Sequence, residues 1–335
     1  MESRERVFRA VEFGGPDRIP LSYNLSPGFK MRHAGALAEL RARFPSDFAE
    51  TGFVEFEGYT QRIDVPERDA WGVVWLRANN DYMGQAVEHP LADLASLETY
   101  QFPDPLRVGD WSRVPEALRR NDGRRYVLVD GDTLFQRLFY LRGFESLMLD
   151  IHYELPELLF VRDQIAAYVL RKLEKWCEYD IDGVRFRDDW GSQSSLLVHP
   201  KKWRRLFRPV YRRLFDAVHA SGKHVWFHSD GNILQILPDL LELGADVLNP
   251  QAAVVGVDDL ARDYAGRVCF LGEVDRQTVM PLAKPEEAAT YTHYVAAALG
   301  TARGGLIGHT FVGPDVPLAN VEAIWQAFLD HRYQG

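Results

Sequence analysis

Residues able to do chemistry gather in the stretch KHVWFHSDGN, residues 223–232. The apolar run at 225–227 is long enough for a short buried strand, and His228 and Asp230 follow it two positions apart. Two side chains at that spacing on an extended chain face the same way. An imidazole and a carboxylate so placed can hold a divalent metal, or act as a base and the group that orients it. The alternative for Asp230 is a turn and helix cap, because Asp-Gly-Asn suits both.

A similar ending follows the apolar segment GVRFR. Here Asp188 and Asp189 stand beside the apolar Trp190, and neighbouring carboxylates in such a place suit a general acid with a raised pKa. In the other interpretation, Arg185 and Arg187 hold both carboxylates ionised in a structural ion pair. The sequence leaves both interpretations open.

Two further endings lie near the C-terminus. Glu273 and Asp275 follow RVCFLG with the same two-residue spacing, and either add ligands, orient the histidine of the first stretch, or form a surface salt bridge with Arg276. His309 follows GGLIG and is either a third metal ligand or a hydrogen-bonded loop histidine.

Strand and helix alternate around these endings. Such alternation implies parallel strands joined by right-handed crossovers, and eight strands close a (β/α)₈ barrel. The predicted strands are 18–23, 51–57, 126–131, 182–188, 223–229, 245–249, 267–272 and 304–309, and the predicted helices include 29–43, 133–149 and 200–220. We therefore predict a single TIM-barrel domain over residues 1–335, with about 60–110 as an excursion over the mouth where the strand ends converge.

Composition sets limits on the class of protein. The 335 residues are 46% apolar, which suits one barrel or two α/β domains. A net charge of -9 argues against general binding of nucleic acid or membrane surfaces. The two cysteines, Cys177 and Cys269, form no disulfide framework. No signal-peptide core and no apolar run near the ~20 residues of a membrane span is present, so we expect a cytoplasmic protein.

Several ungapped segments, in order, resemble the uroporphyrinogen decarboxylase superfamily. They are RERVFRAVEFGGPDRIP, DDWGSQ, HPKKWRRLFRPVYRRLFDAVHASGK, HSDGN, DVLNPQ, LGEVDRQ and GPDVPLANVEAI. The resemblance spans nearly the whole chain and implies a (β/α)₈ barrel. True uroporphyrinogen decarboxylases carry an arginine-rich motif of the RQAGRY kind where this chain has LSYNLSPGFKMRHAG, which argues against haem biosynthesis.

The other branch that the resemblance implies contains corrinoid-dependent methyltransferases. Its thiol-activating members hold zinc with a His-x-Cys pair and a later Cys. His228 matches that histidine, Asp230 stands at the first cysteine, and His309 or Thr310 stands at the second. Such ligands are harder than thiolates and better suited to polarising an oxygen or amine substrate. The combination of DDWGSQ and HSDGN looks most like the aryl-ether O-demethylase branch.

We therefore expect methyl transfer between a small methylated donor, methoxy-aromatic compounds included, and methylcobamide on a partner corrinoid protein. One divalent metal is expected, with zinc as the leading candidate. The residues assigned are Asp188, Asp189, His228 and Glu273 for catalysis, with Asp189 as general acid; His228, Asp230, Glu273 and His309 for the metal; and Tyr23, Trp190, Gln193, Asn249, Gln251, Arg276 and Phe311 for substrate, where Tyr23, Trp190 and Phe311 would form an apolar wall.

Two alternatives remain open at this point. One is metal-free decarboxylation of a carboxylated pyrrole or another small acid, whose carboxylates Arg185 and Arg187 would hold. The other is a corrinoid- or small-molecule-binding protein without catalysis. A homodimer also remains open.

Overall fold

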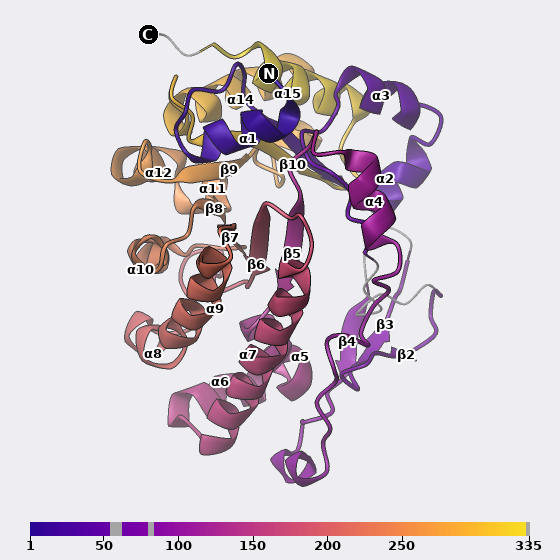
Figure 1. The fold of residues 1–335 in the computed structure, drawn as a ribbon, viewed down its shortest axis with the longest axis vertical. Helices are drawn as coiled ribbons and strands as arrows, with labels where there is room; N and C mark the ends of the chain where they lie inside the picture. The colour runs from indigo at the N-terminus through magenta and orange to yellow at the C-terminus, as the bar shows by residue number, and fades with distance from the viewer. Residues whose placement is uncertain (54–61, 80–83, 333–335) are drawn as a thin grey trace.

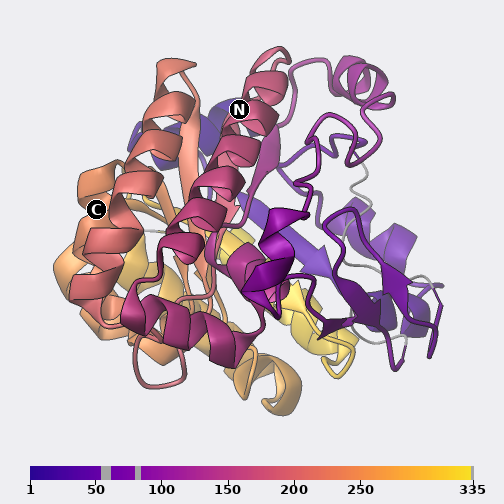
Figure 2. The ribbon, with the colours of Figure 1, turned by 90° about the horizontal axis from the view of Figure 1, so that it is seen from below.

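The computed structural model describes residues 1–53, 62–79 and 84–332, and a seven-stranded parallel sheet forms its core. Across the sheet the strands are β1 (Leu21–Leu25), β10 (Leu306–Val312), β9 (Cys269–Glu273), β8 (Val247–Pro250), β7 (His224–Ser229), β6 (Gly183–Arg187) and β5 (Leu128–Asp132). The sheet curls, and helices cover its outer face (Figures 1 and 2). This TIM-barrel-like arrangement confirms the predicted fold class.

Between the edge strands β1 and β5 the backbone at 46–49 takes the place of a regular strand. The N–H of Asp47 donates to the carbonyl of Leu21 over 2.9 Å, and that of Ala49 donates to the carbonyl of Tyr126, also over 2.9 Å. The segment therefore bonds to both sides of the gap. Residues 51–53 of the predicted strand 51–57 are not strand, and its remainder lies outside the described residues.

The helices lie between the strands along the chain. They are α1 (Ser3–Val11), α2 (Pro27–Arg32), α3 (Leu37–Arg43), α4 (Val114–Asn121), α5 (Phe135–Arg142), α6 (Phe144–Tyr153), α7 (Pro156–Cys177), α8 (Pro200–Leu206), α9 (Arg208–Ala220), α10 (Leu237–Leu243), α11 (Ala252–Val255), α12 (Val257–Tyr264), α13 (Val279–Leu282), α14 (Pro285–Leu299) and α15 (Leu318–Asp330), with 3₁₀ turns η1 (Leu94–Glu98) and η2 (Leu234–Ile236). In the described part of the chain, no helix combines the length and the apolar character that crossing a membrane requires.

Three predicted helices are each divided in two. The predicted helix 133–149 breaks at Gly143, whose φ of 81° lies outside the helical region. The predicted helix 200–220 breaks before Pro209, whose ring and missing N–H stop a helix from running through it. The predicted helix 29–43 becomes α2 and α3, separated by residues 33–36.

The excursion carries a small antiparallel sheet of its own. Its strands are β2 (Glu67–Arg68), β3 (Val74–Leu76) and β4 (Gln85–Glu88), and Figure 1 shows them beside the barrel, at the end toward which β5 and β6 point. Trp71 joins it to the barrel because its ring packs against Tyr168 of α7 at 4.6 Å and beneath the guanidinium of Arg137 at 4.6 Å.

The interior of the barrel is apolar at its amino end. Val7 and Ala10 of α1 pack there against an inner cluster that includes Tyr126, Trp226 and Cys269. Burying these side chains is favourable and closes that end to water. The charged residues that line the mouth cavity, among them Arg187, Asp189 and Glu273, lie toward the carboxyl end, where the loops meet.

Candidate active site

Strand periodicity decides which polar residues on β6 reach the barrel interior. Phe186 points outward and stacks on Phe215 of α9, with ring centroids 5.4 Å apart, whereas Arg185 and Arg187 line the inner cavity. Successive side chains of a strand alternate between the two faces. Asp188 therefore continues the outward direction of Phe186, and Asp189 continues the inward direction of Arg187.

Asp188 has a structural position that its sequence context did not reveal. Its side chain is 0% exposed, and its carboxylate accepts hydrogen bonds from the backbone N–H groups of Leu134, Phe135 and Gln136 at the start of α5. The hydroxyl of Tyr211 donates to it over 2.5 Å. Asp188 thus caps α5 from a neighbouring strand, and it does not line the cavity that the catalytic assignment requires.

Asp189 is the carboxylate of this pair that reaches the cavity. Burial, and then the charge of Asp230, raises its pKa. The side-chain amide of Gln136 donates to one of its oxygens, and the backbone N–H of Asp230 donates to the other over 2.9 Å. A carboxyl group that faces the cavity and has a raised pKa suits the predicted general acid.

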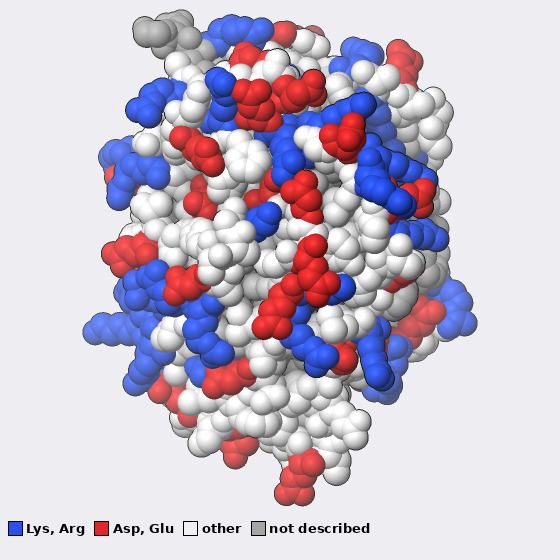
Figure 3. Space-filling model, in the orientation of Figure 1, with Lys and Arg blue, Asp and Glu red and all other residues white. Residues whose placement is uncertain are grey.

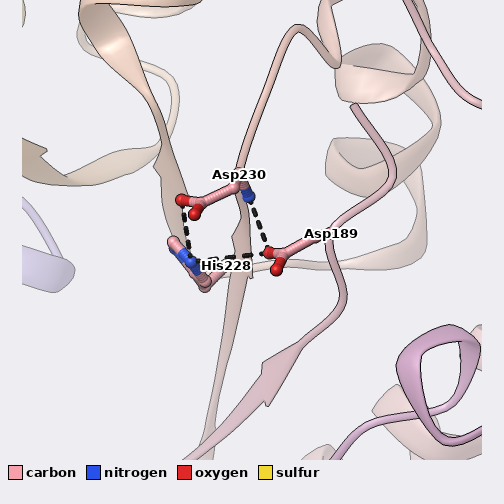
Figure 4. A group of neighbouring side chains, drawn as sticks. All are labelled: Asp189, His228 and Asp230. Carbon is pink, nitrogen blue, oxygen red and sulfur yellow. Dashed lines mark hydrogen bonds and ion pairs between the residues drawn. The ribbon is translucent and has the colours of Figure 1, made fainter. Parts of the chain in front are cut away.

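Asp189, His228 and Asp230 form one cluster where β6 and β7 end (Figure 4). Nε2 of His228 lies 3.4 Å from Oδ1 of Asp230 and 3.8 Å from Oδ1 of Asp189. One ligand atom from each residue lies within 4.8 Å of the others. The three side chains point toward a common centre, as the spacing of His228 and Asp230 predicted.

The environment of His228 fixes which ring nitrogen faces the cluster. Its Nδ1 lies 3.0 Å from the carbonyl oxygen of Asn249, and a carbonyl only accepts, so Nδ1 carries a hydrogen and donates it. This leaves Nε2 toward the carboxylates. Burial lowers the pKa of His228, but the hydrogen bond with Asp230 and the charges of Glu273, Asp230 and Asp189 outweigh it and raise that pKa above its usual value.

Glu273 and His309 line the same cavity outside this cluster. Nε2 of His309 lies 3.9 Å from Oε1 of Glu273, and Nδ1 lies 3.1 Å from the hydroxyl of Ser22. Burial raises the pKa of Glu273. Burial also lowers the pKa of His309 to about 3, assisted by the charges of Arg185 and other cations, so its ring is neutral near pH 7.

The cavity at the mouth has a volume of about 440 Å³. Its lining brings together Asn24, Trp75, Gly84, Asp132, Thr133, Gln136, Arg137, Tyr140, Arg185, Arg187, Asp189, His228, Asp230, Asn249, Glu273, Arg276, His309 and Phe311. The excursion contributes Trp75 and Gly84, which places it over the mouth as predicted. Arg276, which lines the cavity, forms an ion pair with Asp230 and so contacts the cluster directly.

Two aromatic residues expected in the apolar wall lie elsewhere. Tyr23 points to the outer face of β1, where its ring stacks on Trp325 of α15 at 4.1 Å. Trp190 is 0% exposed, stacks on Phe135 at 4.1 Å and donates from its indole to the hydroxyl of Tyr211. Both side chains point away from the barrel interior, so Tyr23 and Trp190 do not contribute to a wall of the cavity. Phe311, the third residue expected in the wall, does line the cavity, together with Trp75 and Tyr140.

Two glutamines assigned to substrate also lie outside the mouth cavity. Gln193 is exposed and pairs with Gln277 across two loops. Gln251 accepts a hydrogen bond from the backbone N–H of Gly231 over 2.6 Å. Gln251 therefore supports the loop that carries Asp230 without facing the substrate space.

Asp132 is a cavity residue that the sequence analysis missed. Its carboxylate lies 3.0 Å from Nζ of Lys172, which is 0% exposed, and 3.3 Å from the guanidinium of Arg137. Burial opposes ionisation, but these two cations lower the pKa of Asp132 to about 2. The signal was available, because Asp130 and Asp132 repeat the two-residue spacing at the end of a predicted strand.

Arg185 and Arg187 share a carboxylate inside the barrel. Nε of Arg185 lies 2.9 Å from Oδ1 of Asp130, and Nε of Arg187 lies 3.5 Å from the same oxygen. The ion pair predicted for these arginines exists, but its partner is Asp130 and neither Asp188 nor Asp189. Two guanidinium groups therefore meet at one carboxylate on the cavity side of β6.

The chain is similar in sequence to one known family and in fold to solved structures. Residues 84–331 match the sequence model of the family described as uroporphyrinogen decarboxylase (URO-D). Among curated protein sequences, none gives a significant match. A solved methyltransferase from Methanosarcina mazei is similar over 98% of this chain and 98% of its own, with a TM-score of 0.72 and 16% identity, which shows a shared fold.

Two other solved structures are less similar. A chitinase from Chromobacterium violaceum has a TM-score of 0.46 and 11% identity over 93% of this chain and 100% of its own. A dihydropteroate synthase from Anaplasma phagocytophilum has a TM-score of 0.39 and 14% identity over 58% of this chain and 71% of its own. Both likenesses are too weak to carry an argument.

Proposed function

The chain belongs to the uroporphyrinogen decarboxylase family, and from this premise we propose that it transfers a methyl group between a small methylated donor and a corrinoid protein at the barrel mouth. Methoxy-aromatic compounds are the leading donors, because Trp75, Tyr140 and Phe311 line the cavity. The cavity volume of about 440 Å³ suits a single small ring with its substituents.

The observation that carries the proposal is the cluster of Asp189, His228 and Asp230. Its residues fit a divalent metal, and zinc is the leading candidate. Nδ1 of His228 donates its hydrogen to the carbonyl of Asn249, and a backbone carbonyl is a usual partner for the second nitrogen of a metal-binding histidine. This leaves Nε2 as the nitrogen that would bind the metal. A bound metal would polarise the oxygen or amine of the donor. His309 lies nearby as an additional ligand.

The chain's own residues would handle the proton of this reaction. The methyl carbon leaves the donor oxygen for the reduced cobalt of the corrinoid, and the bonding electrons remain on that oxygen. The oxygen then needs a proton. A carboxyl group that binds a metal is ionised, so Asp189 could donate this proton only while no metal is bound. In the metal-bound protein Glu273 is the assigned source, because burial raises its pKa and it lines the cavity outside the cluster.

Demethylation tests this proposal directly. The purified protein is loaded with zinc and incubated with a reduced corrinoid protein and a panel of methoxy-aromatic, methylamine and methylthiol donors, and the absorbance of the corrinoid is followed. We expect methylation of the corrinoid with at least one donor, and its loss in His228→Ala. His152→Ala, which removes an exposed histidine on α6, is the matched control and should retain activity. No turnover across the whole panel would contradict the proposal.

Decarboxylation is the second candidate, and one observation favours it. Arg185 and Arg187 both line the cavity, and a guanidinium group there can pair with the carboxylate of a substrate. Glu273 would then stabilise a protonated ring by electrostatics. Release of carbon dioxide from a carboxylated pyrrole, undiminished by a chelator, would favour this candidate over methyl transfer.

A further inference from the structure

A second large cavity opens through the side of the barrel. It has a volume of about 1090 Å³ and lies between β1 and α4, beside the backbone segment that takes the place of a regular strand. We call it the side cleft and define it by its basic residues: Lys30, Arg41, Arg113, Arg120, Arg124 and Arg125 around the opening, and Arg185 at the inner end. Of these, only Arg185 also lines the mouth cavity.

The side cleft is positively charged although the chain as a whole has a net charge of -9. The only acidic residues in the described lining are Glu50 and Glu116. Arg120 is paired with Glu116, and Arg124 lies 3.6 Å from Asp122. Figure 3 shows the resulting concentration of Lys and Arg at its upper right, over α2, α3 and α4.

Four cations of the side cleft have no acidic partner among the described residues. Lys30, Arg41, Arg113 and Arg125 appear in no ion pair within residues 1–53, 62–79 and 84–332, and all four are exposed. Isolated surface cations are normally solvated and do little. These four differ because they come from α2, α3, the residue before α4 and the approach to β5, and they converge on one concave surface.

We propose that the side cleft binds a multiply charged oxyanion, at a site separate from the mouth. Guanidinium groups pair with phosphate and carboxylate oxygens through two parallel hydrogen bonds, and several of them around one concave surface favour a ligand that carries more than one such group. The two cavities share Asn24 and Arg185, so the inner end of the ligand would lie next to the polar interior of the barrel. The site stands independently of methyl transfer, and either proposal can fail alone.

Calorimetric titration tests the side cleft. Pyrophosphate and tricarballylate are titrated separately into the full chain at low ionic strength, which distinguishes a phosphate ligand from a carboxylate ligand. The variants are Arg41→Glu and Arg125→Glu, with Arg41→Gln as a milder change of the same side chain. Arg119→Glu is the matched control, because Arg119 is exposed on α4, does not line the cleft and changes the net charge equally. Circular dichroism confirms that each variant is folded.

The expected result is binding of at least one of the two anions, weakened about tenfold by each reversal in the cleft and unchanged in Arg119→Glu. Binding of pyrophosphate alone assigns the cleft to phosphates, and binding of tricarballylate alone assigns it to carboxylates. Absence of binding by both would overturn the proposal. An equal loss in Arg119→Glu would also overturn it, since that result reports only the general electrostatic field.

Discussion

The carboxylate of Asp189 accepts a hydrogen bond from the backbone N–H of Asp230 over 2.9 Å, which joins the ends of β6 and β7. The same oxygen lies 3.8 Å from Nε2 of His228. One carboxylate therefore positions the loop that carries Asp230 and also faces the histidine. The three side chains form one unit, and a change in the path of either loop should disturb all of them.

Gly231→Ala tests how closely the two loops must approach. Gly231 has a φ of 77°, and a Cβ there would overlap the backbone of Gly191. Gly222 has a φ of 72° and open space around the position of a Cβ. Gly222→Ala therefore measures the free-energy cost of placing a Cβ at a positive φ, without any steric overlap. We expect Gly222→Ala to cost about 1 kcal/mol of unfolding free energy. Gly231→Ala should cost more and should also weaken zinc binding.

Urea unfolding and zinc titration of the two variants provide the measurement. Equal stability and equal zinc affinity in the two variants would show that the contact between Gly191 and Gly231 does not position the cluster.

Asp188 and Asp189 are adjacent but should respond oppositely to substitution. Asp188→Ala removes the acceptor for three backbone N–H groups of α5 and for the hydroxyl of Tyr211, all of them buried or nearly so. Leaving such groups unpaired should lower the unfolding free energy by about 4 kcal/mol. Asp189→Ala should lower it by less than about 1 kcal/mol while abolishing methyl transfer.

Chemical denaturation and the corrinoid assay, applied to both variants, separate these effects. An Asp188→Ala protein that is stable but inactive would contradict the structural role and support the catalytic role predicted from the sequence.

Asp132 should contribute stability that disappears in acid. Its pKa in the folded protein is about 2, below the value of 3.8 for an ordinary aspartate. A lowered carboxyl pKa stabilises the fold above the unfolded pKa, and this contribution is lost as pH falls through the folded pKa. The stability difference between the wild type and Asp132→Asn should therefore shrink by about 2 kcal/mol between pH 4 and pH 2.

Lys172→Met gives an independent check of the same ion pair. It leaves the buried carboxylate of Asp132 without its nearest cation, which should cost about 3 kcal/mol at pH 7. Urea denaturation at pH 7 measures the cost of Lys172→Met, and urea denaturation between pH 4 and pH 2 measures the loss of the Asp132 contribution. A constant difference between wild type and Asp132→Asn from pH 4 to pH 2 would show that Asp132 does not depend on its cations for ionisation.

The sequence predicted the positions of the site better than the directions of its side chains. Apolar runs that end in polar residues located the ends of β6, β7 and β9, whereas β10 continues three residues past His309, where the prediction ended it. The two-residue spacing of His228 and Asp230 correctly placed them on one face. Asp188 and Asp189 were not distinguishable, because which of two neighbours faces inward depends on the alternation along β6. Tyr23 and Trp190 were misplaced for the same reason.

Some contributors to the cavity come from outside the strands. Lys172 and Arg137 lie on helices, where a charged residue is normally expected to face solvent, so only the packing reveals them as partners of Asp132. Trp75 comes from the excursion, whose position relative to the mouth depends on long-range contacts such as that between Trp71 and Tyr168. No local pattern in the sequence encodes such contacts.

Anomalous diffraction at the zinc edge tests whether Asp189, His228 and Asp230 hold a divalent metal. Crystals grown with zinc should show one strong peak beside Nε2 of His228, at a distance of about 2 Å. Crystals of His228→Ala grown in the same way should lack it. Absence of a peak from zinc-supplemented wild-type crystals, with Arg276 still paired to Asp230, would contradict metal binding by these residues and leave His228 to act as a protonated imidazole.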